Sequence, residues 1–268
     1  MTEYLNQGDW ELIANIYRYF GEVGDIEAPG QWRQAFRILE KSMDASFGFV
    51  VVKKRVESIS SKLNGFRPIY MVYSPEASAQ DQAFVADWIA NTSNLLDDPF
   101  FSQLMVHAGR SKIRSRAHLD WHTPEQWDRS NLRFLLEGLE VEDRIVSVLP
   151  ITDELEISFC LERQRGEQRF TPRDEAILEA ITPGIARPMH HFLSYRGLLP
   201  GQDALTEREQ LVLKLLLGPM VVKEIADELD LSTYYVRDIV KSIYRKVGVR
   251  GRIELMAQWL GPSSRLPR

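Results

Sequence analysis

Cysteine is almost absent from this chain of 268 residues, which contains only Cys160. A single cysteine excludes an intrachain disulfide bond, and this suits a reducing compartment. No apolar run approaches the roughly 20 residues that a membrane-spanning helix needs. The N-terminus, MTEYLNQGDW, lacks the basic start and the apolar body of a signal peptide. We therefore expect a cytoplasmic protein that makes no contact with a membrane.

Motifs of the common catalytic sites are also missing. The sequence contains no glycine-rich phosphate loop, no nucleophile elbow and no paired-carboxylate motif. His118 and His122 are four residues apart, but their segment has the pattern of a strand and a turn, where this spacing does not bring two side chains together. Cys160 lies in a predicted strand without a partner and is interpreted as a packed thiol. We expect neither an enzyme nor a bound metal or cofactor.

The composition is that of a globular protein, with 44% hydrophobic and 26% charged residues, and the length predicts about two domains. The charge is divided unevenly. Residues 204–268 contain 11 Lys and Arg against 8 Asp and Glu, a net charge of +3, which leaves −8 for the rest of a chain with a total of −5. A basic small domain joined to an acidic large one is compatible with a C-terminal part that meets nucleic acid.

Four apolar-periodic segments follow one another closely in residues 205–260. Thr206 and Glu209 have the spacing of a capping box, which predicts the start of a first helix. A second helix is expected over residues 223–229, and a fourth over residues 252–260. Between them, a third helix that ends at Gly248 would bury one stripe of side chains, namely Val236, Ile239, Val240, Ile243 and Val247.

The free face of the third helix carries cations and hydrogen-bonding groups. A helix of this kind fits the major groove of DNA, where Arg and Lys pair with phosphates and forked or amphoteric side chains read base edges. An ordinary solvated helix would carry similar charges, so charge alone leaves both interpretations open. On or near this face we place Tyr235, Arg237, Asp238, Lys241, Ser242, Arg245 and Lys246.

Short motifs favour the DNA interpretation. They are Thr206, Arg208 and Glu209 followed by Val212 and Leu213, the run Lys223-Glu224-Ile225-Ala226, and Tyr235-Val236-Arg237 with Ile243 and residues 245–249. In this order they resemble the C-terminal DNA-binding domain of the LuxR family of transcriptional regulators. Three positions depart from the family pattern: Val221 replaces an N-cap serine, Tyr235 a small threonine, and Ile239 a polar residue.

The resemblance implies double-stranded DNA as a partner and a homodimer as the binding form. The last helix dimerises in related domains, and here we expect Ile253, Met256, Ala257 and Leu260 to face the core, which leaves Leu255 and Trp259 for dimerisation. The resemblance and the helical pattern together give the expected DNA-binding residues, which are Lys223, Ser232, Thr233, Tyr234, Tyr235, Arg237, Asp238, Lys241, Ser242, Arg245 and Lys246.

Residues 1–198 are expected to form an α+β domain, joined by a linker over residues 199–203 to an all-α helix-turn-helix domain over residues 204–264. Two helices come first, then strands over 47–53 and 68–74, a helix over 77–90 and a strand near 112–119. A helix from Thr123 to Gly138 follows. Strands over 143–151 and 154–164 form a hairpin with only one buried face, and a long helix begins at Thr171. This order, an antiparallel sheet flanked by helices, is similar to the GAF/PAS-like superfamily.

Aromatic residues under the covering helices either line a pocket for a small-molecule ligand or simply fill the core. The leading hypothesis is a dimeric transcriptional regulator whose N-terminal domain senses a small molecule or a partner and positions the recognition helices. The alternative is a protein-interaction module with a degenerate helix-turn-helix, in which Tyr235 and Ile239 form a protein-binding patch. The pocket candidates are Tyr70, Tyr73, Trp88, Phe101, Trp121 and Trp127.

Overall fold

The computed structural model describes residues 4–22, 28–55, 66–75, 77–90, 112–115, 125, 128 and 130–260. These residues divide into two compact units. The boundary lies between Ile185 and Ala186, inside helix α8 (Pro172–Tyr195). Of the described residues, those up to Ile185 form unit 1 and those from Ala186 onwards form unit 2.

Unit 1 is built on a five-stranded antiparallel sheet with the strand order β2-β1-β5-β4-β3. Its strands are β1 (Phe47–Arg55), β2 (Phe66–Tyr73), β3 (Lys112–Ser115), β4 (Val141–Pro150) and β5 (Leu155–Gln164). A short turn joins β4 to β5, where the amide of Ile151 donates to the carbonyl of Leu155 at 2.8 Å. The antiparallel sheet and this hairpin confirm the corresponding predictions.

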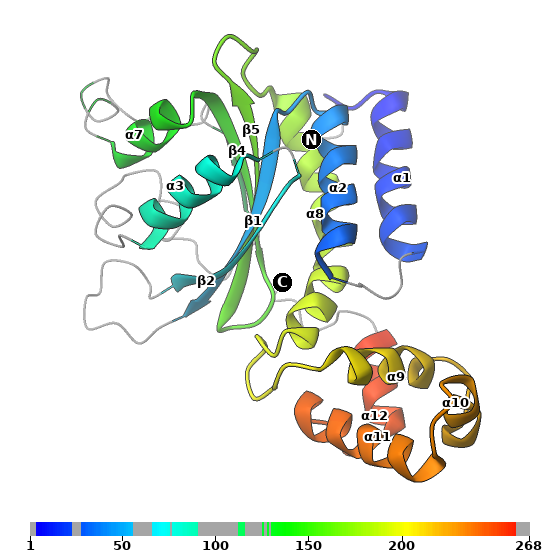
Figure 1. Ribbon diagram of the computed structural model, residues 1–268. Coiled ribbons are helices and arrows are strands. Elements are labelled where there is room, and N and C mark those ends of the chain that lie inside the picture. Colours follow the sequence, from blue (N-terminus) through cyan, green and yellow to red (C-terminus); the bar gives the residue numbers. More distant parts are fainter. Residues whose placement is uncertain are drawn as a thin grey trace. The chain divides into compact units, whose positions relative to one another are not determined.

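Helices cover both faces of the sheet. Figure 1 shows α1 (Gln7–Glu22), α2 (Ala28–Ser42) and α8 on one side, and α3 (Ala79–Ala90) and α7 (Asn131–Gly138) on the other. On the α2 side, the rings of Phe36 and Phe159 stack with centroids 5.1 Å apart. A Cβ atom at Gly48 would lie 2.9 Å from Phe36, so only glycine allows α2 to approach β1 this closely.

The expectation that one face of β5 would be exposed is wrong. All residues from Leu155 to Arg163 are buried, including Glu156 and Glu162, both at 0% exposure. Cations on neighbouring strands make this possible: Lys53 lies 2.5 Å from Glu156, and Arg144 forms an ion pair with Glu162. A buried carboxylate is tolerated when a cation compensates its lost hydration, and strand alternation cannot reveal a partner on another strand.

The predicted helix from Thr123 to Gly138 is confirmed over Asn131–Gly138, but it does not run unbroken through Ser130. The backbone at Ser130 is extended, and the Ser130 hydroxyl accepts a hydrogen bond from the amide of Arg133 at 3.4 Å. Serine is a favoured N-cap because its oxygen replaces a missing intrahelical acceptor, so a separate helix, α7, begins at Asn131. Of the strand expected near residues 112–119, the structure describes residues 112–115 as β3.

Helix α8 begins as the hydroxyl-and-acid pattern predicts. The amide of Thr171 donates to the carboxylate of Asp174 at 2.7 Å, and the amide of Asp174 donates to the Thr171 hydroxyl at 3.4 Å. Each proline inside a helix removes one backbone donor. The helix nevertheless continues through Pro183 and Pro188 to Tyr195, because tertiary packing holds this segment.

Unit 2 contains the C-terminal part of α8 and four short helices. These are α9 (Glu207–Leu217), α10 (Val222–Glu228), α11 (Thr233–Val247) and α12 (Arg252–Leu260). One apolar cluster joins them, and it includes Tyr195, Val212, Ile225, Ile243 and Trp259. The expected four-helix arrangement is confirmed. Residues 199–203, the expected linker, hydrogen-bond to this unit, since the amide of Asp203 donates to the carbonyl of Lys246 at 3.0 Å.

Candidate nucleic-acid interface

The first two helices of the helix-turn-helix begin with different caps. At α9, the Thr206 hydroxyl accepts from the amide of Glu209 at 3.3 Å, and the Glu209 carboxylate accepts from the amide of Thr206 at 2.7 Å, which confirms the predicted capping box. At α10, Val221 has no side-chain acceptor, and only the reciprocal bond remains, from the Val221 amide to Glu224 at 2.8 Å. Glu224 therefore keeps its half of the capping box, whereas the bond that a serine hydroxyl would accept from the Glu224 amide is missing.

A tight turn leads from α10 into α11. Asp230 adopts a positive φ of 52°, a conformation that aspartate tolerates better than most residues. Ser232 is the N-cap of α11, and its hydroxyl accepts from the amide of Tyr235 at 3.2 Å. At the other end Gly248, with φ of 76°, terminates the helix. The serine cap at Ser232 and the left-handed glycine at Gly248 therefore fix the two ends of α11.

Helix α11 buries the predicted stripe and presents a second stripe to solvent. Val236, Val240, Ile243 and Val247 lie in the core, as does Ile239. Helical periodicity places Tyr234, Asp238, Lys241 and Arg245 on the opposite side. Tyr234 is 74% exposed, and the Lys241 side chain is 76% exposed and pairs with Asp238 at 3.2 Å.

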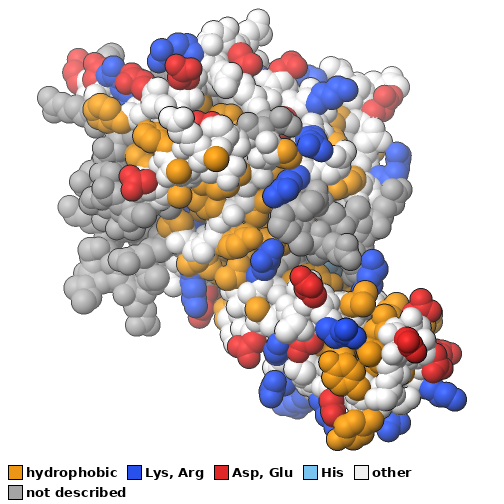
Figure 2. Space-filling view, viewed as in Figure 1, with side chains coloured by type: hydrophobic (Ala, Val, Ile, Leu, Met, Phe, Trp, Pro, Cys, Tyr) orange, Lys and Arg blue, Asp and Glu red, His pale blue; other side chains and the backbone are white. Residues whose placement is uncertain are grey.

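The solvent-facing side of α11 therefore combines cations with one large aromatic ring. Arg237 flanks the stripe and is exposed. Figure 2 shows basic side chains on the visible surface of the helical unit, mixed with acidic and apolar ones. A surface of this kind can place positive charge against phosphates and several different side chains against base edges.

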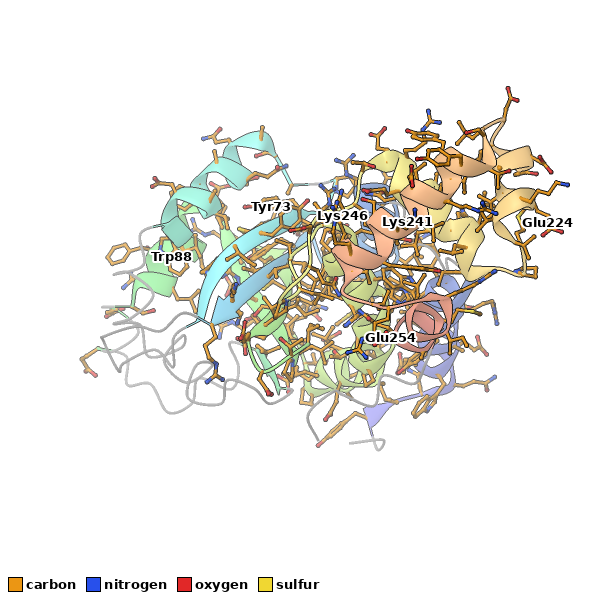
Figure 3. The ribbon with its side chains drawn as sticks, turned by 90° about the horizontal axis from the view of Figure 1, so that it is seen from below. Tyr73, Trp88, Glu224, Lys241, Lys246 and Glu254 are labelled. Carbon is orange, nitrogen blue, oxygen red and sulfur yellow. The ribbon has the colours of Figure 1, made fainter. Side chains whose placement is uncertain are left out.

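Two predicted contact residues have another role within the unit. The hydroxyl of Ser242 donates to Glu209 at 2.7 Å, and the ammonium of Lys246 donates to the other oxygen of Glu209 at 2.7 Å. The Lys246 side chain is 17% exposed and also donates to the carbonyl of Ala204 at 3.1 Å. Lys241 and Lys246 both belong to α11 (Figure 3), but only the first is on the exposed stripe. Glu209 thus fastens α11 to the start of α9.

The electrostatics of Glu209 match this arrangement. Burial alone would raise the pKa of the Glu209 carboxyl. The hydrogen bonds from Lys246, Thr206 and Ser242 outweigh burial and lower the pKa to about 2. The carboxylate is therefore charged throughout the physiological pH range, and it accepts hydrogen bonds from three positions of the chain.

The sequence did not reveal this role of Glu209. Its partners Ser242 and Lys246 are 33 and 37 residues away along the chain. Local patterns identify the capping box, but they do not show which exposed-looking residue of a later helix turns towards it. The remaining predicted contact residues keep surface positions: Lys223, Ser232, Tyr234, Tyr235, Arg237, Lys241 and Arg245 are exposed, and Thr233 and Asp238 are half-buried.

The assignment of the two faces of α12 is wrong. Leu255 and Trp259, expected to be free for dimerisation, are 0% and 1% exposed, whereas Ile253, expected in the core, is 87% exposed. The Trp259 ring stacks on His191 of α8 at 4.9 Å, and its carbonyl oxygen lies 2.9 Å from Nε2 of His191. The C-terminal turns of α8 supply this aromatic contact, so Leu255 and Trp259 form core rather than surface.

The protein-binding patch of the alternative hypothesis does not form either. Tyr235 is 48% exposed, but Ile239 is 7% exposed and belongs to the core of unit 2. At position 239 the family pattern has a polar residue, and the isoleucine found here is packed in the core. The two residues do not share a surface.

The ligand-pocket candidates divide between the two faces of the sheet. Tyr73 pairs in register with Phe49 and, like Trp88 (Figure 3), packs on the apolar cluster beneath α3 and α7. Tyr70 pairs with Val52 and, three residues from Tyr73, lies on the opposite face. The structure thus brings Tyr73 and Trp88 together and separates Tyr70 from them. Phe101, Trp121 and Trp127 lie outside the described residues.

Charged groups are buried next to this apolar cluster. The guanidinium of Arg144 pairs with Glu162 and lies 5.3 Å from the centroid of the Phe49 ring. Burial and the charge of Glu162 raise the pKa of Tyr73 to about 12, and its hydroxyl donates to the carbonyl of Gln82 at 3.2 Å. Burial raises the pKa of Cys160 to about 12, which agrees with a packed thiol.

Clusters of metal-ligating side chains and long apolar helices are both absent from the described part of the chain. Within those ranges, no group of three or more His, Cys, Asp and Glu side chains could hold a metal ion. His118 and His122 lie outside them. No helix in the same ranges is long and apolar enough to cross a membrane.

Comparisons with known proteins complete the description of the site. Several solved structures resemble the chain at low identity, among them the three that follow. Escherichia coli SdiA matches with a TM-score of 0.46 and 12% identity over 97% of this chain and 99% of that one. SdiA in complex with octanoyl-rac-glycerol gives 0.46 and 11% over 96% of each chain. The VqsR LBD domain from Pseudomonas aeruginosa gives 0.47 and 16% over 69% of this chain and 96% of that one.

The sequence comparisons identify the family of the C-terminal segment. No curated protein sequence is significantly similar to the chain as a whole. Residues 203–258 match the family described as bacterial regulatory proteins, luxR family. They span α9, α10 and α11 and most of α12, including every residue of the exposed stripe. Residues 203–258 are therefore a helix-turn-helix domain of the luxR family of bacterial regulatory proteins.

Proposed function

We propose that the protein is a DNA-binding transcriptional regulator that reads the major groove with α11. The observation that carries the proposal is the exposed stripe of α11, with Lys241 and Arg245 along it and Arg237 beside it, within a luxR-family helix-turn-helix. A helix with a cationic outer face on a small domain fits the width of the groove. Arg237 and Lys241 are the proposed base or near-base contacts, and Lys223 and Arg245 the proposed phosphate contacts.

Contact with DNA requires little rearrangement of this surface. Lys241 must leave Asp238, but an exposed pair of this kind contributes only about 0–1 kcal/mol. Ser242 and Lys246 act differently, because their bonds to Glu209 hold α11 in place on α9. They are positioning residues in this proposal. Because they hold α11 in its orientation before DNA binds, less binding energy is lost in ordering the groove-facing residues.

We further propose that unit 1 is a GAF/PAS-like sensor domain of a cytoplasmic homodimer, with a small molecule or a protein partner as its signal. Two observations support a sensor. The face of the sheet beneath α3 and α7 combines Tyr73 and Trp88 with buried ion pairs, a mixture of apolar surface and few polar groups that suits ligand binding. Helix α8 contributes Ile177 to the core of unit 1 and Tyr195 to that of unit 2, so it can carry a change from one to the other.

A dimer is supported by the mode of recognition. One recognition helix covers a short half-site, and specific binding by helix-turn-helix proteins uses two copies on a pseudo-palindromic site. Leu255 and Trp259 are in the core, whereas Ile253 is a large apolar side chain that α12 exposes and that is available for such pairing.

The test uses duplexes selected from a random pool by the full-length protein. Fluorescence anisotropy then compares wild type with Lys241→Ala, and with Lys41→Ala as a control that removes one exposed charge from α2 of unit 1. We expect Lys241→Ala to weaken binding by about 5-fold or more, since a good base or phosphate contact contributes about 1–3 kcal/mol, and Lys41→Ala to match wild type. Equal binding by all three proteins would contradict the assigned role of Lys241. Capture of a protein without salt-sensitive DNA binding would favour the interaction module instead.

A further inference from the structure

An exposed aromatic ring stands at the start of the recognition helix. Tyr234 is the second residue of α11 and is 74% exposed, whereas its neighbour Tyr235 is 48% exposed. Scattered apolar residues are normal on a protein surface, but this one lies on the same stripe as Lys241 and Arg245. The position makes the ring part of the proposed DNA-facing surface rather than of the core.

The geometry sets what the ring can reach. Lys241 follows Tyr234 by seven residues, which is about 10 Å along the helix axis. In helix-turn-helix proteins the N-terminal residues of the recognition helix are those that contact base edges. At the N-terminal end of α11, Tyr234 is therefore in position to reach base edges about two helical turns away from Lys241.

The chemistry of the ring limits its choice of partner. Apart from its hydroxyl, the Tyr234 ring is apolar, so it cannot form the ion pairs with phosphate that Lys241 and Arg245 can form. Most groups on the major-groove edge of the bases are hydrogen-bond donors or acceptors, and the apolar one is the C5-methyl group of thymine. We infer that Tyr234 is a specificity-determining residue whose ring packs on a thymine methyl group in the half-site. This inference rests on the proposed function.

The experiment removes the methyl group alone. Duplexes selected by the full-length protein are resynthesised with uracil in place of thymine, one position at a time, and affinities are measured by fluorescence anisotropy at a fixed salt concentration. Burying one methyl group contributes enough to predict that wild type binds about fourfold more weakly when the contacted thymine is replaced. Tyr234→Ala should bind the thymine and uracil duplexes equally well.

Two further variants keep the result interpretable. Tyr234→Phe preserves the ring and should keep the sensitivity to uracil, which separates the ring from its hydroxyl. Tyr4→Ala removes a 56%-exposed tyrosine from unit 1 and should behave as wild type on every duplex. Alanine is favourable in helices, so Tyr234→Ala should preserve α11, and an unchanged circular dichroism spectrum checks this.

The outcomes separate this inference from the proposed function. Two results would overturn the role of Tyr234 while salt-sensitive DNA binding still supports a regulator. In the first, replacing thymine by uracil weakens the binding of Tyr234→Ala as much as that of wild type. In the second, the affinity of wild type does not change with uracil at any position. Failure of the wild-type protein to select any duplex overturns the proposed function, and the role of Tyr234 falls with it. Loss of thymine discrimination in Tyr234→Ala alone supports the inference.

Discussion

Replacing Glu209 by glutamine tests whether the carboxylate holds the recognition helix on α9. A pKa lowered from 4.5 to about 2 corresponds to about 3 kcal/mol of preference for the charged form in the folded state. Glutamine keeps an oxygen that can accept from Ser242 or Thr206, but it loses the charge that faces Lys246. We therefore expect Glu209→Gln to lower the stability of unit 2 by between about 1 and 3 kcal/mol at pH 7.

The pH dependence has a definite sign. Because folding lowers the pKa of Glu209, its contribution is complete above the unfolded pKa of about 4.5 and disappears as the pH falls through the folded pKa of about 2. The difference between wild type and Glu209→Gln should accordingly be largest at neutral pH, shrink below about pH 4.5 and be small near pH 2.

Hydrogen exchange with mass spectrometry measures this on the full-length protein. Peptides within residues 233–247 report the opening free energy of α11, and wild type and variant are compared at the same pH. Glu207→Gln is the matched control, since it removes one exposed carboxylate from the same first turn of α9 and should change stability by less than about 0.5 kcal/mol. If Glu209→Gln protects α11 as well as Glu207→Gln does at pH 7, the anchoring role is wrong.

Three further substitutions test other parts of the structure. Trp259→Ala removes a 1%-exposed indole from the core of unit 2 and should destabilise it by about 3–5 kcal/mol, seen as faster hydrogen exchange across residues 207–260. Arg144→Met leaves Glu162 buried without its cation and should lower the free energy of unfolding, measured in urea, by about 3–5 kcal/mol. The double variant Arg144→Met with Glu162→Leu should recover most of this loss. An equally unstable double variant would argue against the ion pair as the cause. Ile253→Asp should weaken self-association in sedimentation velocity with little change in stability, and unchanged association would remove α12 from the dimer contact.

The helix-turn-helix could be predicted from sequence because its signals are local. The capping box at Thr206, the serine cap at Ser232 and the glycine that ends α11 each depend on residues a few positions apart. The buried stripe of α11 repeats with the helical period over about three turns, which leaves one arrangement of its faces. Unit 1 gave a similar local signal at the β4–β5 hairpin and at the start of α8.

Features that depend on distant partners could not be predicted in this way. Helix α12 carries two apolar stripes, and distant contacts, among them that of Trp259 with His191, 68 residues away, determine which one is buried. Glu156 and Glu162 alternate with apolar residues as they would on an exposed face, and their cations lie on other strands. Lys246 has the position of a DNA contact in the sequence, but in the structure its ammonium forms an ion pair with Glu209.

The dependence of operator affinity on salt concentration tests the central claim, that the exposed face of α11 lies against phosphates and bases, most directly. A protein that neutralises several phosphates with Lys and Arg releases their counterions, so the logarithm of its association constant falls linearly with the logarithm of the salt concentration. The account predicts such a slope for wild type, and a slope smaller by about one for Arg245→Ala. A wild-type affinity that is independent of salt would contradict it. So would a salt slope that Arg245→Ala does not change, if Lys241→Ala also leaves the affinity unchanged.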